Sequence, residues 1–307
     1  EGLDGVLQTQ FEADDLESLG LLKMDLLGIK NLTIISNVVN LIKKNRHIEI
    51  DVNKIPLNDE KTYLLLAEGN TTGIFQFESK GMTNVLREVN GKTFEDIVAV
   101  NAMYRPGPKN NIPRFINRRK GRERVSYLHA DLAPILEATY GLIMYQEQIM
   151  LILHKIGGYS LGDADLLRRI IAKKQKATIE KEKINFIEKA KLQGYEETVS
   201  ARIFDYIVMS GDYGFNRSHA VAYTLIAYQM AYLKTNYPEE FMTELLSSAL
   251  GNENHTNRYI KECRRYGINV ENISVNKSDY RYYIEKSGSI RLPFLIIKGI
   301  SKSSAEL

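Results

Sequence analysis

Cysteine is almost absent from this chain, whose 307 residues include only one, Cys263. A single cysteine excludes an internal disulfide framework and most cysteine-based metal sites, and it is typical of the reducing cytoplasm. No apolar run approaches the roughly 18 residues that a membrane-spanning helix needs. Internal repeats and low-complexity linkers are also lacking. We therefore expect a globular cytoplasmic protein with no membrane partner.

The remaining composition is that of a globular protein, with 44% hydrophobic and 26% charged residues. The length suggests about two domains. The chain starts without methionine, and residues 303–307 have the pattern of a helix interior. We therefore expect a fragment of a longer protein.

Net positive charge is small, +3, but it is unevenly spread. The first 17 residues contain six acidic residues and no Lys or Arg, whereas residues 105–124 carry eight Lys or Arg against one acid, Glu123. A second basic cluster occupies residues 168–176. Two clusters of this density suggest contact with a polyanion. A solvated charged face explains either cluster equally well when it is taken alone.

Hydrophobic spacing predicts a mainly α protein with a small β portion, that is, an α+β fold. Residues 20–28 alternate like a strand, and residues 280–298 alternate around a Ser-Gly-Ser turn, as in a β-hairpin. Helices are expected at residues 31–44, 59–68, 79–89, 93–103, 110–120, 130–138, 143–155, 163–191, 197–209, 218–235, 238–250 and 255–266.

The most informative segment is residues 213–223, a Gly-containing loop that runs into an apolar helix. Asn216 or Ser218 can cap that helix, and its free N–H groups add positive potential that suits phosphate. The helix is apolar on nearly every side, so we expect it to be buried. An ordinary capped core helix with a surface arginine is the competing interpretation.

In the predicted strand at 20–28, Leu22, Met24 and Leu26 share one face, and Lys23 and Asp25 share the other. Charged side chains in a core-like strand are costly unless something pairs with them. The two residues can neutralise each other. Alternatively, Asp25 ligates a hard divalent cation and Lys23 touches an anionic substrate.

Paired arginines occur on the predicted helix at 163–191. Its buried stripe should consist of Leu166, Leu167, Ile170 and Ile171. Arg169 and Lys173 are four residues apart and share another face. Arginine binds phosphate oxygens bidentately and lysine adds a point charge, so this face suits a polyphosphate.

A stripe of arginines is predicted on the helix at 110–120. Arg114, Arg118 and Arg122 are spaced i, i+4, i+8 and would line one face, anchored by apolar residues on the other. Such a stripe can follow a phosphate backbone without preferring a base sequence. The competing interpretation is that these arginines pair with the acidic N-terminal segment and never meet DNA.

Six motifs in one order make the pattern specific. They are GLLKMDLLGIKNLT (20–33), TTGIFQFES (71–79), YRPGP (104–108), YGLIMYQEQ (140–148), LLRR (166–169) and YGFNRSHA (213–220). Over essentially its whole length the chain resembles the family of bacterial DNA polymerase III α subunits, the family C replicative polymerases. Within that family it resembles the shorter α-subunit type.

The resemblance implies three regions. Residues 1–30 would be the C-terminal piece of the palm and residues 31–280 the fingers. Residues 281–307 would be a β-hairpin and the truncated start of a helix-hairpin-helix-like DNA-binding element, with Ser301 where a second glycine is usual.

The implied activity is that of a DNA-directed DNA polymerase, which transfers a nucleotide from a dNTP to a primer 3′-hydroxyl with two Mg²⁺ ions. The implied partners are primer-template DNA, dNTP and, in the intact protein, the sliding clamp and other replisome subunits. The chain contains one of the family's three catalytic carboxylates, so we expect it to be inactive alone.

The resemblance also assigns residues. Asp25 matches a palm carboxylate that is catalytic and holds metal. The expected nucleotide-binding residues are Lys23, Arg168, Arg169, Lys173, Tyr213, Asn216, Arg217, Ser218, His219 and Tyr223. The expected DNA-binding residues are Arg105, Arg114, Arg118, Arg119, Arg122, Lys298 and Gly299. Two alternatives stay open: a non-catalytic nucleic-acid-binding module, and an error-prone family C paralogue.

Overall fold

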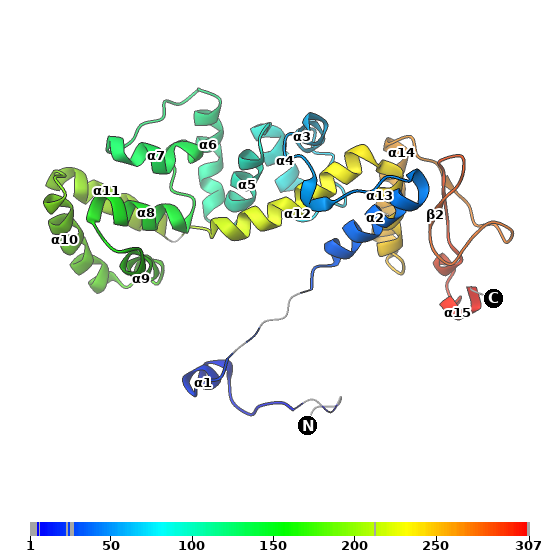
Figure 1. Cartoon of the computed structure of the whole chain (residues 1–307), viewed down its shortest axis with the longest axis horizontal. Helices are drawn as coiled ribbons and strands as arrows, with labels where there is room; N and C mark the ends of the chain where they lie inside the picture. Colours follow the sequence, from blue (N-terminus) through cyan, green and yellow to red (C-terminus); the bar gives the residue numbers. More distant parts are fainter. Residues whose placement is uncertain (1–4, 6, 23, 25–27, 212, 306–307) are drawn as a thin grey trace.

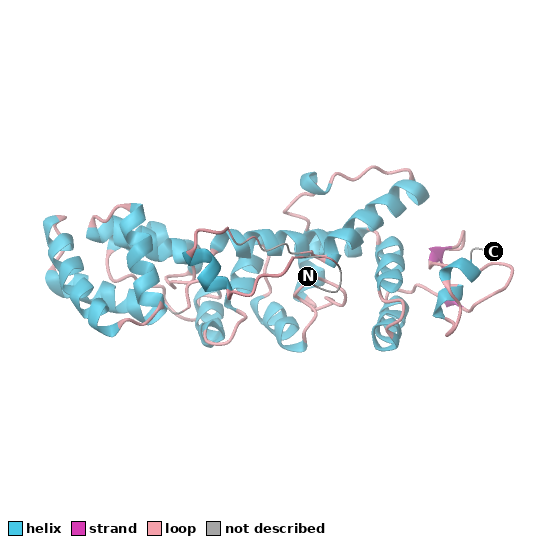
Figure 2. Ribbon diagram, turned by 90° about the horizontal axis from the view of Figure 1, so that it is seen from below, coloured by secondary structure: helices cyan, strands magenta, loops and turns pink. Residues whose placement is uncertain are grey.

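The computed structural model describes residues 5, 7–22, 24, 28–211 and 213–305. They form an elongated, mainly helical body with a small β element near the C-terminal end (Figures 1 and 2). The fold class predicted from the sequence is therefore confirmed. Of the helices in the described ranges, none has the combination of length and hydropathy that crossing a membrane requires.

Apart from the single helix predicted at residues 163–191, the predicted helices begin and end close to the expected positions. Many start at a polar residue whose side chain accepts a hydrogen bond from the first turn, as Asp59, Ser79 and Thr93 do. In chain order the helices are α1 (Ala13–Ser18), α2 (Lys30–Arg46), α3 (Glu60–Ala67), α4 (Lys80–Val89), α5 (Phe94–Met103), α6 (Ile112–Arg119), α7 (Ala133–Leu136), α8 (Gln146–Gly157), α9 (Leu161–Ala172), α10 (Lys176–Leu192), α11 (Glu197–Gly211), α12 (Arg217–Asn236), α13 (Pro238–Ser248), α14 (Glu253–Arg265) and α15 (Lys302–Ala305).

Two hydrophobic cores divide the body. The first lies among α2 to α6 and α12 to α14, around side chains such as Phe77, Tyr228 and Phe241. The second lies among α7 to α11, around Phe186 and Phe204. Helix α12 is the longest helix in the described part of the chain and runs through the middle of the molecule, from near the second core into the first (Figure 1).

The β element contains three short strands in the order β1-β3-β2, namely Val270–Glu271, Ile290–Arg291 and Tyr283–Ile284. β2 and β3 pair antiparallel, with Ile284 opposite Ile290, which confirms the predicted hairpin. β1 pairs with β3 in parallel and was not predicted. Two residues are too short a run for an alternating pattern to be recognised.

The prediction of a strand at residues 20–28 is wrong for the residues of that stretch that the structure describes. Residues 20–22, 24 and 28 are in no strand, and Leu22 and Met24 are 84% and 71% exposed instead of lying in a core. A strand is stable only when neighbouring strands complete its hydrogen bonds. The described sheet is formed by residues 270–291 and does not include this segment.

The single helix predicted at 163–191 is two helices, α9 and α10, separated by residues 173–175. Lys174 has a left-handed backbone (φ 54°), which ends α9 without a Gly or Pro signal. Both helices pack against α8, which a single straight helix could not do along its whole length. Leu166 is 60% exposed, whereas Leu167 and Ile171 are buried as predicted.

Helix α12 is buried only in part, contrary to the prediction. The C-terminal half lies in the first core, where Ala227, Met230 and Leu233 are fully buried. In the N-terminal half, His219 and Ala222 are exposed. The apolar pattern therefore corresponds to core contacts in the C-terminal half of α12. The N-terminal half has an accessible surface.

A buried lysine connects α12 with α14 and with the loop after α3. Lys234 is fully buried, and its Nζ donates to Glu262 Oε1 (2.7 Å) and to the carbonyls of Asn70 (2.8 Å) and Thr72 (2.9 Å). Burial lowers the pKa of Lys234, and Glu262 opposes that shift. The ammonium group thus has all three of its donors used.

We expect Lys234→Met to lower the free energy of unfolding by about 3–5 kcal/mol, because it leaves Glu262 and two carbonyls buried without their donor. Arg265→Ala is the matched control. Arg265 contacts the other oxygen of the same carboxylate at 3.1 Å, but its side chain is 58% exposed, so we expect a loss of about 1 kcal/mol or less. Urea unfolding measures both losses, and equal losses would contradict the role given to burial.

Candidate functional site

Segments that are far apart in the sequence meet at the N-terminal end of α12. Phe215 N–H donates to the Met144 carbonyl (2.9 Å), and Gln146 N–H donates to the Phe215 carbonyl (2.9 Å). Arg105 donates to the Tyr213 carbonyl (3.0 Å). The motifs at 140–148 and 213–220 are therefore joined by backbone hydrogen bonds, and the Arg105 side chain joins the motif at 104–108 to the same place.

The first turn of α12 is already occupied by acceptors from the protein. Asn216 is the cap, and its side chain accepts from His219 N–H (2.7 Å), which decides between the two predicted caps. Both oxygens of Glu147 accept from Arg217 N–H (3.0 Å each), and the Arg217 guanidinium pairs with Glu95 (2.8 Å). A carboxylate at this position is stabilised by the helix dipole, the same effect that underlies the predicted preference for phosphate. The N–H groups of residues 217 and 219 are not free, however.

Three rings form a row along α12, which we call the aromatic row: Phe215, His219 and Tyr223. His219 stacks on Tyr223, with ring centroids 4.0 Å apart and planes 23° apart, and meets Phe215 edge-on at 5.3 Å. Tyr223 contacts Phe75 from the motif at 71–79 (5.5 Å). Spacing of four residues places His219 and Tyr223 on one face of α12, and Phe215 precedes the first turn of that helix. This face is partly exposed and can stack on a planar ligand.

Arg105 and Gly107 fix the loop that supports this row. The Arg105 guanidinium lies 4.1 Å from the centre of the Phe215 ring, a cation–π contact, and burial lowers the pKa of Arg105. Gly107 has φ +93°, and a Cβ there would come within 2.6 Å of the Tyr213 ring. Only glycine fits this combination of backbone and close approach.

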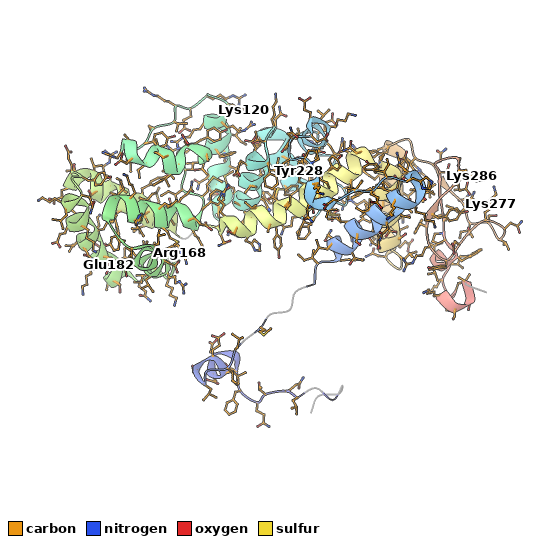
Figure 3. All side chains as sticks on the ribbon, in the orientation of Figure 1. Lys120, Arg168, Glu182, Tyr228, Lys277 and Lys286 are labelled. Carbon is orange, nitrogen blue, oxygen red and sulfur yellow. The ribbon has the colours of Figure 1, made fainter. Side chains whose placement is uncertain are left out.

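Arg168 and Arg169 both pair with Asp165 on the preceding turn of α9. Arg168 donates twice to Asp165 Oδ1 (2.9 and 2.7 Å), and Arg169 donates to Oδ2 (2.9 Å). The hydrogen bond from Arg168, with that from Arg169, holds the pKa of Asp165 below its usual range. Arg168 projects from α9, far along the molecule from Tyr228 in the first core (Figure 3). Lys173 is exposed at the end of α9.

The end of α9 lies beside the segment that leads to the aromatic row. Gly211, two residues before Tyr213, approaches Ile171 so closely that an added Cβ would lie 2.3 Å from its side chain. The end of α9 thus packs against the end of α11, the helix that precedes α12 in the chain. Asp165 is not among the residues predicted from the sequence, although its spacing of three and four residues from the arginines is the helical ion-pair spacing.

The predicted residues Lys23 and Asp25 lie outside the described residues. Among the residues that are described, no group of three or more His, Cys, Asp or Glu side chains could hold a metal ion.

The comparisons with known proteins agree with the resemblance in the motifs. Residues 31–194 match the family model for the bacterial DNA polymerase III alpha subunit finger domain. The chain is 48% identical over 306 residues to the DNA polymerase III subunit alpha of Bacillus subtilis, covering 100% of this chain and 27% of that protein. The corresponding protein of Staphylococcus epidermidis is 46% identical over 304 residues (99% of the chain, 28% of the relative), and that of Halalkalibacterium halodurans is 46% identical over 293 residues (95% and 26%).

The chain belongs to the family of bacterial DNA polymerase III alpha subunits. It spans about a quarter of the length of these relatives.

Most of the arginines predicted to bind DNA in this family member have partners within the protein. Arg114 and Arg118 both donate to Glu123 Oε1 (2.9 Å each), and Arg118 also donates to the Tyr140 carbonyl (2.9 Å). Neither contacts the acidic N-terminal segment in the described residues. Arg122 follows the end of α6, so the predicted stripe along one helix face is wrong for that residue: the helix ends at Arg119.

Arg119 is a structural residue of the first core. Its Nε and Nη2 donate to the two oxygens of Asp96 (2.6 and 2.9 Å), and Nη1 donates to the Val89 carbonyl (2.7 Å). Burial alone would raise the pKa of Asp96. The hydrogen bonds from Arg119 and from Lys92 N–H outweigh it and lower that pKa.

The other two predicted DNA-binding residues, Lys298 and Gly299, lie in the exposed turn between residues 294–296 and α15. Gly299 has φ +95°, which suits a tight turn. Their proposed contact with DNA stays a prediction.

We expect Arg119→Ala to destabilise the fold by about 3–5 kcal/mol, because it leaves Asp96 buried without its partner. Asp96 stabilises the folded protein above its unfolded pKa, and this contribution is lost as the pH falls through the lower folded pKa. Without Arg119 the folded pKa rises, so acid unfolding should begin at higher pH. Urea unfolding between about pH 3 and pH 7 measures this shift.

Arg122→Ala is the control, since the exposed Arg122 side chain has no hydrogen bond or ion pair among the described residues. It should leave stability unchanged. If Arg119→Ala also leaves stability unchanged but lowers the slope of log K against log salt for duplex DNA by about 0.9, Arg119 meets a phosphate instead.

We expect Gly107→Ala to cost more stability than Gly194→Ala. Both glycines have φ +93°, so each substitution carries backbone strain of about 1–3 kcal/mol, but nothing lies within 4 Å of a Cβ at Gly194. The added displacement of Tyr213 should cost about 1 kcal/mol or more. Equal unfolding midpoints would show that the contact with Tyr213 has no energetic role.

Proposed function

We propose that the intact protein is a DNA-directed DNA polymerase of bacterial replication, and that this chain supplies the fingers that bind the incoming dNTP. The observation that carries this proposal is the meeting of separate family motifs at the N-terminal end of α12, where Arg105, Arg217 and the aromatic row form one surface. In this proposal residues 1–30 belong to the palm, residues 31–280 to the fingers, and residues 281–307 to a DNA-binding element.

Two kinds of contact support a nucleotide as the ligand of these fingers. Aromatic rings such as His219 and Tyr223 can stack on a base or a sugar. Arg168 and Arg169 present guanidinium forks that match phosphate oxygens, and each already binds one oxygen of the Asp165 carboxylate. Asp165 thus keeps both forks oriented, and a triphosphate would add to or replace its contacts.

The reaction proposed for the intact protein is attack of a primer 3′-hydroxyl on the α-phosphorus of a dNTP, with release of pyrophosphate. Mg²⁺ would supply charge neutralisation and activation of the hydroxyl. The fixed positive charges on α9 would stabilise the negative charge of the triphosphate.

Primer-template DNA, dNTP, the sliding clamp and other replisome subunits are the proposed partners, and the cytoplasm is the proposed location. Of the alternatives, the error-prone paralogue shares the whole mechanism. A non-catalytic DNA-binding module is less favoured, because Arg114, Arg118 and Arg119 are held by Glu123 and Asp96 within the protein.

We expect Arg168→Ala in the intact protein to lower kcat/KM for dNTP by roughly 10- to 150-fold, the effect of losing a charge-assisted hydrogen bond to phosphate. Arg168→Lys should recover only part of the loss, because lysine keeps the charge but not the fork. Steady-state primer extension at varied dNTP measures both.

Arg264→Ala is the matched control, since Arg264 is exposed on α14 and its side chain has no partner among the described residues. An unchanged kcat/KM for dNTP in Arg168→Ala, with a collapse of DNA affinity, would contradict the proposal and assign the arginine to the DNA path.

A further inference from the structure

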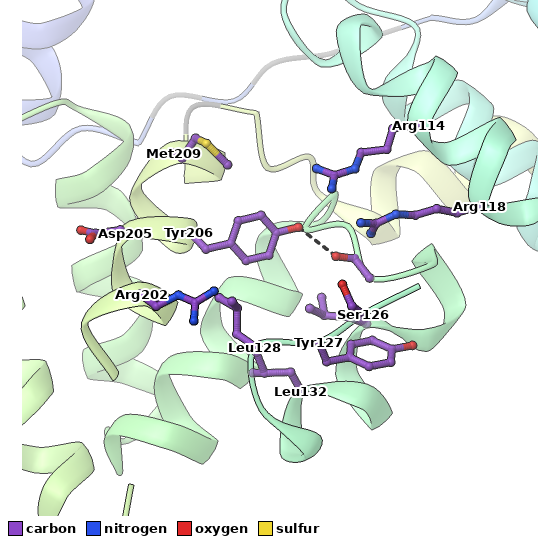
Figure 4. Close-up of a pocket in the computed structure, with 12 residues that line it drawn as sticks. Arg114, Arg118, Ser126, Tyr127, Leu128, Leu132, Arg202, Asp205, Tyr206 and Met209 are labelled. Atoms are coloured by element: carbon purple, nitrogen blue, oxygen red, sulfur yellow. Dashed lines mark hydrogen bonds between the residues drawn. The ribbon is translucent and has the colours of Figure 1, made fainter. Parts of the chain in front are cut away.

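A cleft of about 600 Å³ lies between α6 and α11, apart from the aromatic row (Figure 4). Its polar walls are Arg114 and Arg118 on one side and Arg202 of α11 on the other. Tyr206 lies between them and donates to the Gly141 carbonyl at 2.9 Å, so the floor of the cleft is fixed. A volume of this size accommodates a ligand as large as a nucleotide.

The charges that face this cleft leave a net positive site. Glu123 is shared by Arg114 and Arg118, so the three together carry one positive charge. Asp205 is paired with Lys183 (2.6 Å). Among the described residues the Arg202 side chain has neither a hydrogen bond nor an ion pair, and it points into the cleft from α11 (Figure 4). An unpaired guanidinium opposite a half-neutralised arginine pair favours a singly charged anion such as a phosphodiester.

The rest of the lining is apolar. Leu128 and Leu132 form one wall, and Met209, which is 65% exposed, stands at the edge. An exposed methionine beside a cationic site suits a flat apolar group, because its thioether side chain adapts to the face of a ring. The cleft therefore combines one anion-binding part with one part that fits a planar ring.

We propose that this cleft binds one nucleotide unit, with its phosphate between Arg202 and Arg114 and its base against Leu128 and Met209. The site is distinct from the surface at the start of α12, and it does not depend on the polymerase activity proposed above. The nucleotide unit can belong to a single strand of DNA or to a free nucleotide.

The test is equilibrium binding of fluorescein-labelled dT10 to the full 307-residue chain, followed by fluorescence anisotropy at several salt concentrations. We expect Arg202→Ala to weaken binding roughly tenfold, because a charge-assisted contact is lost. It should also lower the slope of log K against log salt by about 0.7, the value for one phosphate of a single strand. Met209→Glu, which places a carboxylate at the exposed edge, should weaken binding as well.

Two controls match these variants. Arg264→Ala removes an exposed, unpartnered arginine of α14, and Leu192→Glu adds a carboxylate at a position of α10 that is 85% exposed. Both lie outside the cleft and should bind dT10 like the unmodified chain. Equal thermal midpoints for all four variants exclude loss of folding as the cause.

Titration with dTMP separates the two sources of the ligand. Direct binding of dTMP that Arg202→Ala weakens supports a site for free nucleotide, and binding of dT10 alone supports a site for a strand. If Arg202→Ala binds both probes as tightly as Arg264→Ala does, the proposal is wrong. The same variants leave Arg168 and the aromatic row intact, so this result is independent of the test of dNTP use.

Discussion

The buried ammonium group of Lys234 is the interaction on which the arrangement of the first core depends. Its contacts with the carbonyls of Asn70 and Thr72 hold the start of the motif at 71–79 against α12. That motif then places Phe75 against Tyr223, three helical turns before Lys234 on the same helix. A desolvated charge at one end of α12 thereby fixes the surroundings of the aromatic row at the other. Its desolvation costs free energy, but it ties three separate segments to one point.

The arginines of this chain fall into two groups. Some stabilise the fold through internal ion pairs, and others are exposed and available to a ligand. Arg118 and Arg119 are largely buried and brace α6 against Glu123 and Asp96. Arg202 and Arg122 are exposed and have no partner among the described residues. A count of positive charges overstates the surface available to a polyanion, because a guanidinium paired with a carboxylate of the protein adds little external field.

The two candidate binding places differ in what holds their cations. Around α9, Asp165 orients both arginines before any ligand arrives, which reduces the entropy lost on binding. In the cleft between α6 and α11, Arg202 is not held in this way and depends on the ligand for its partner. We therefore expect the arginines of α9 to discriminate between ligands by their geometry. The cleft between α6 and α11 should accept a broader range of anions.

Much of this protein was determined by the sequence itself. Helix positions followed from apolar spacing and from residues that break helices, because these are local properties of the sequence. The family followed from six motifs in order. Only the tertiary structure decided the end of α9 at Lys174, the exposure of Leu22 and Met24, and the burial of Lys234. It alone showed that Glu123, Asp96 and Asp165 occupy arginines expected to face ligands. Such pairings depend on which elements come together in space, and a charge pattern along the chain does not contain that information.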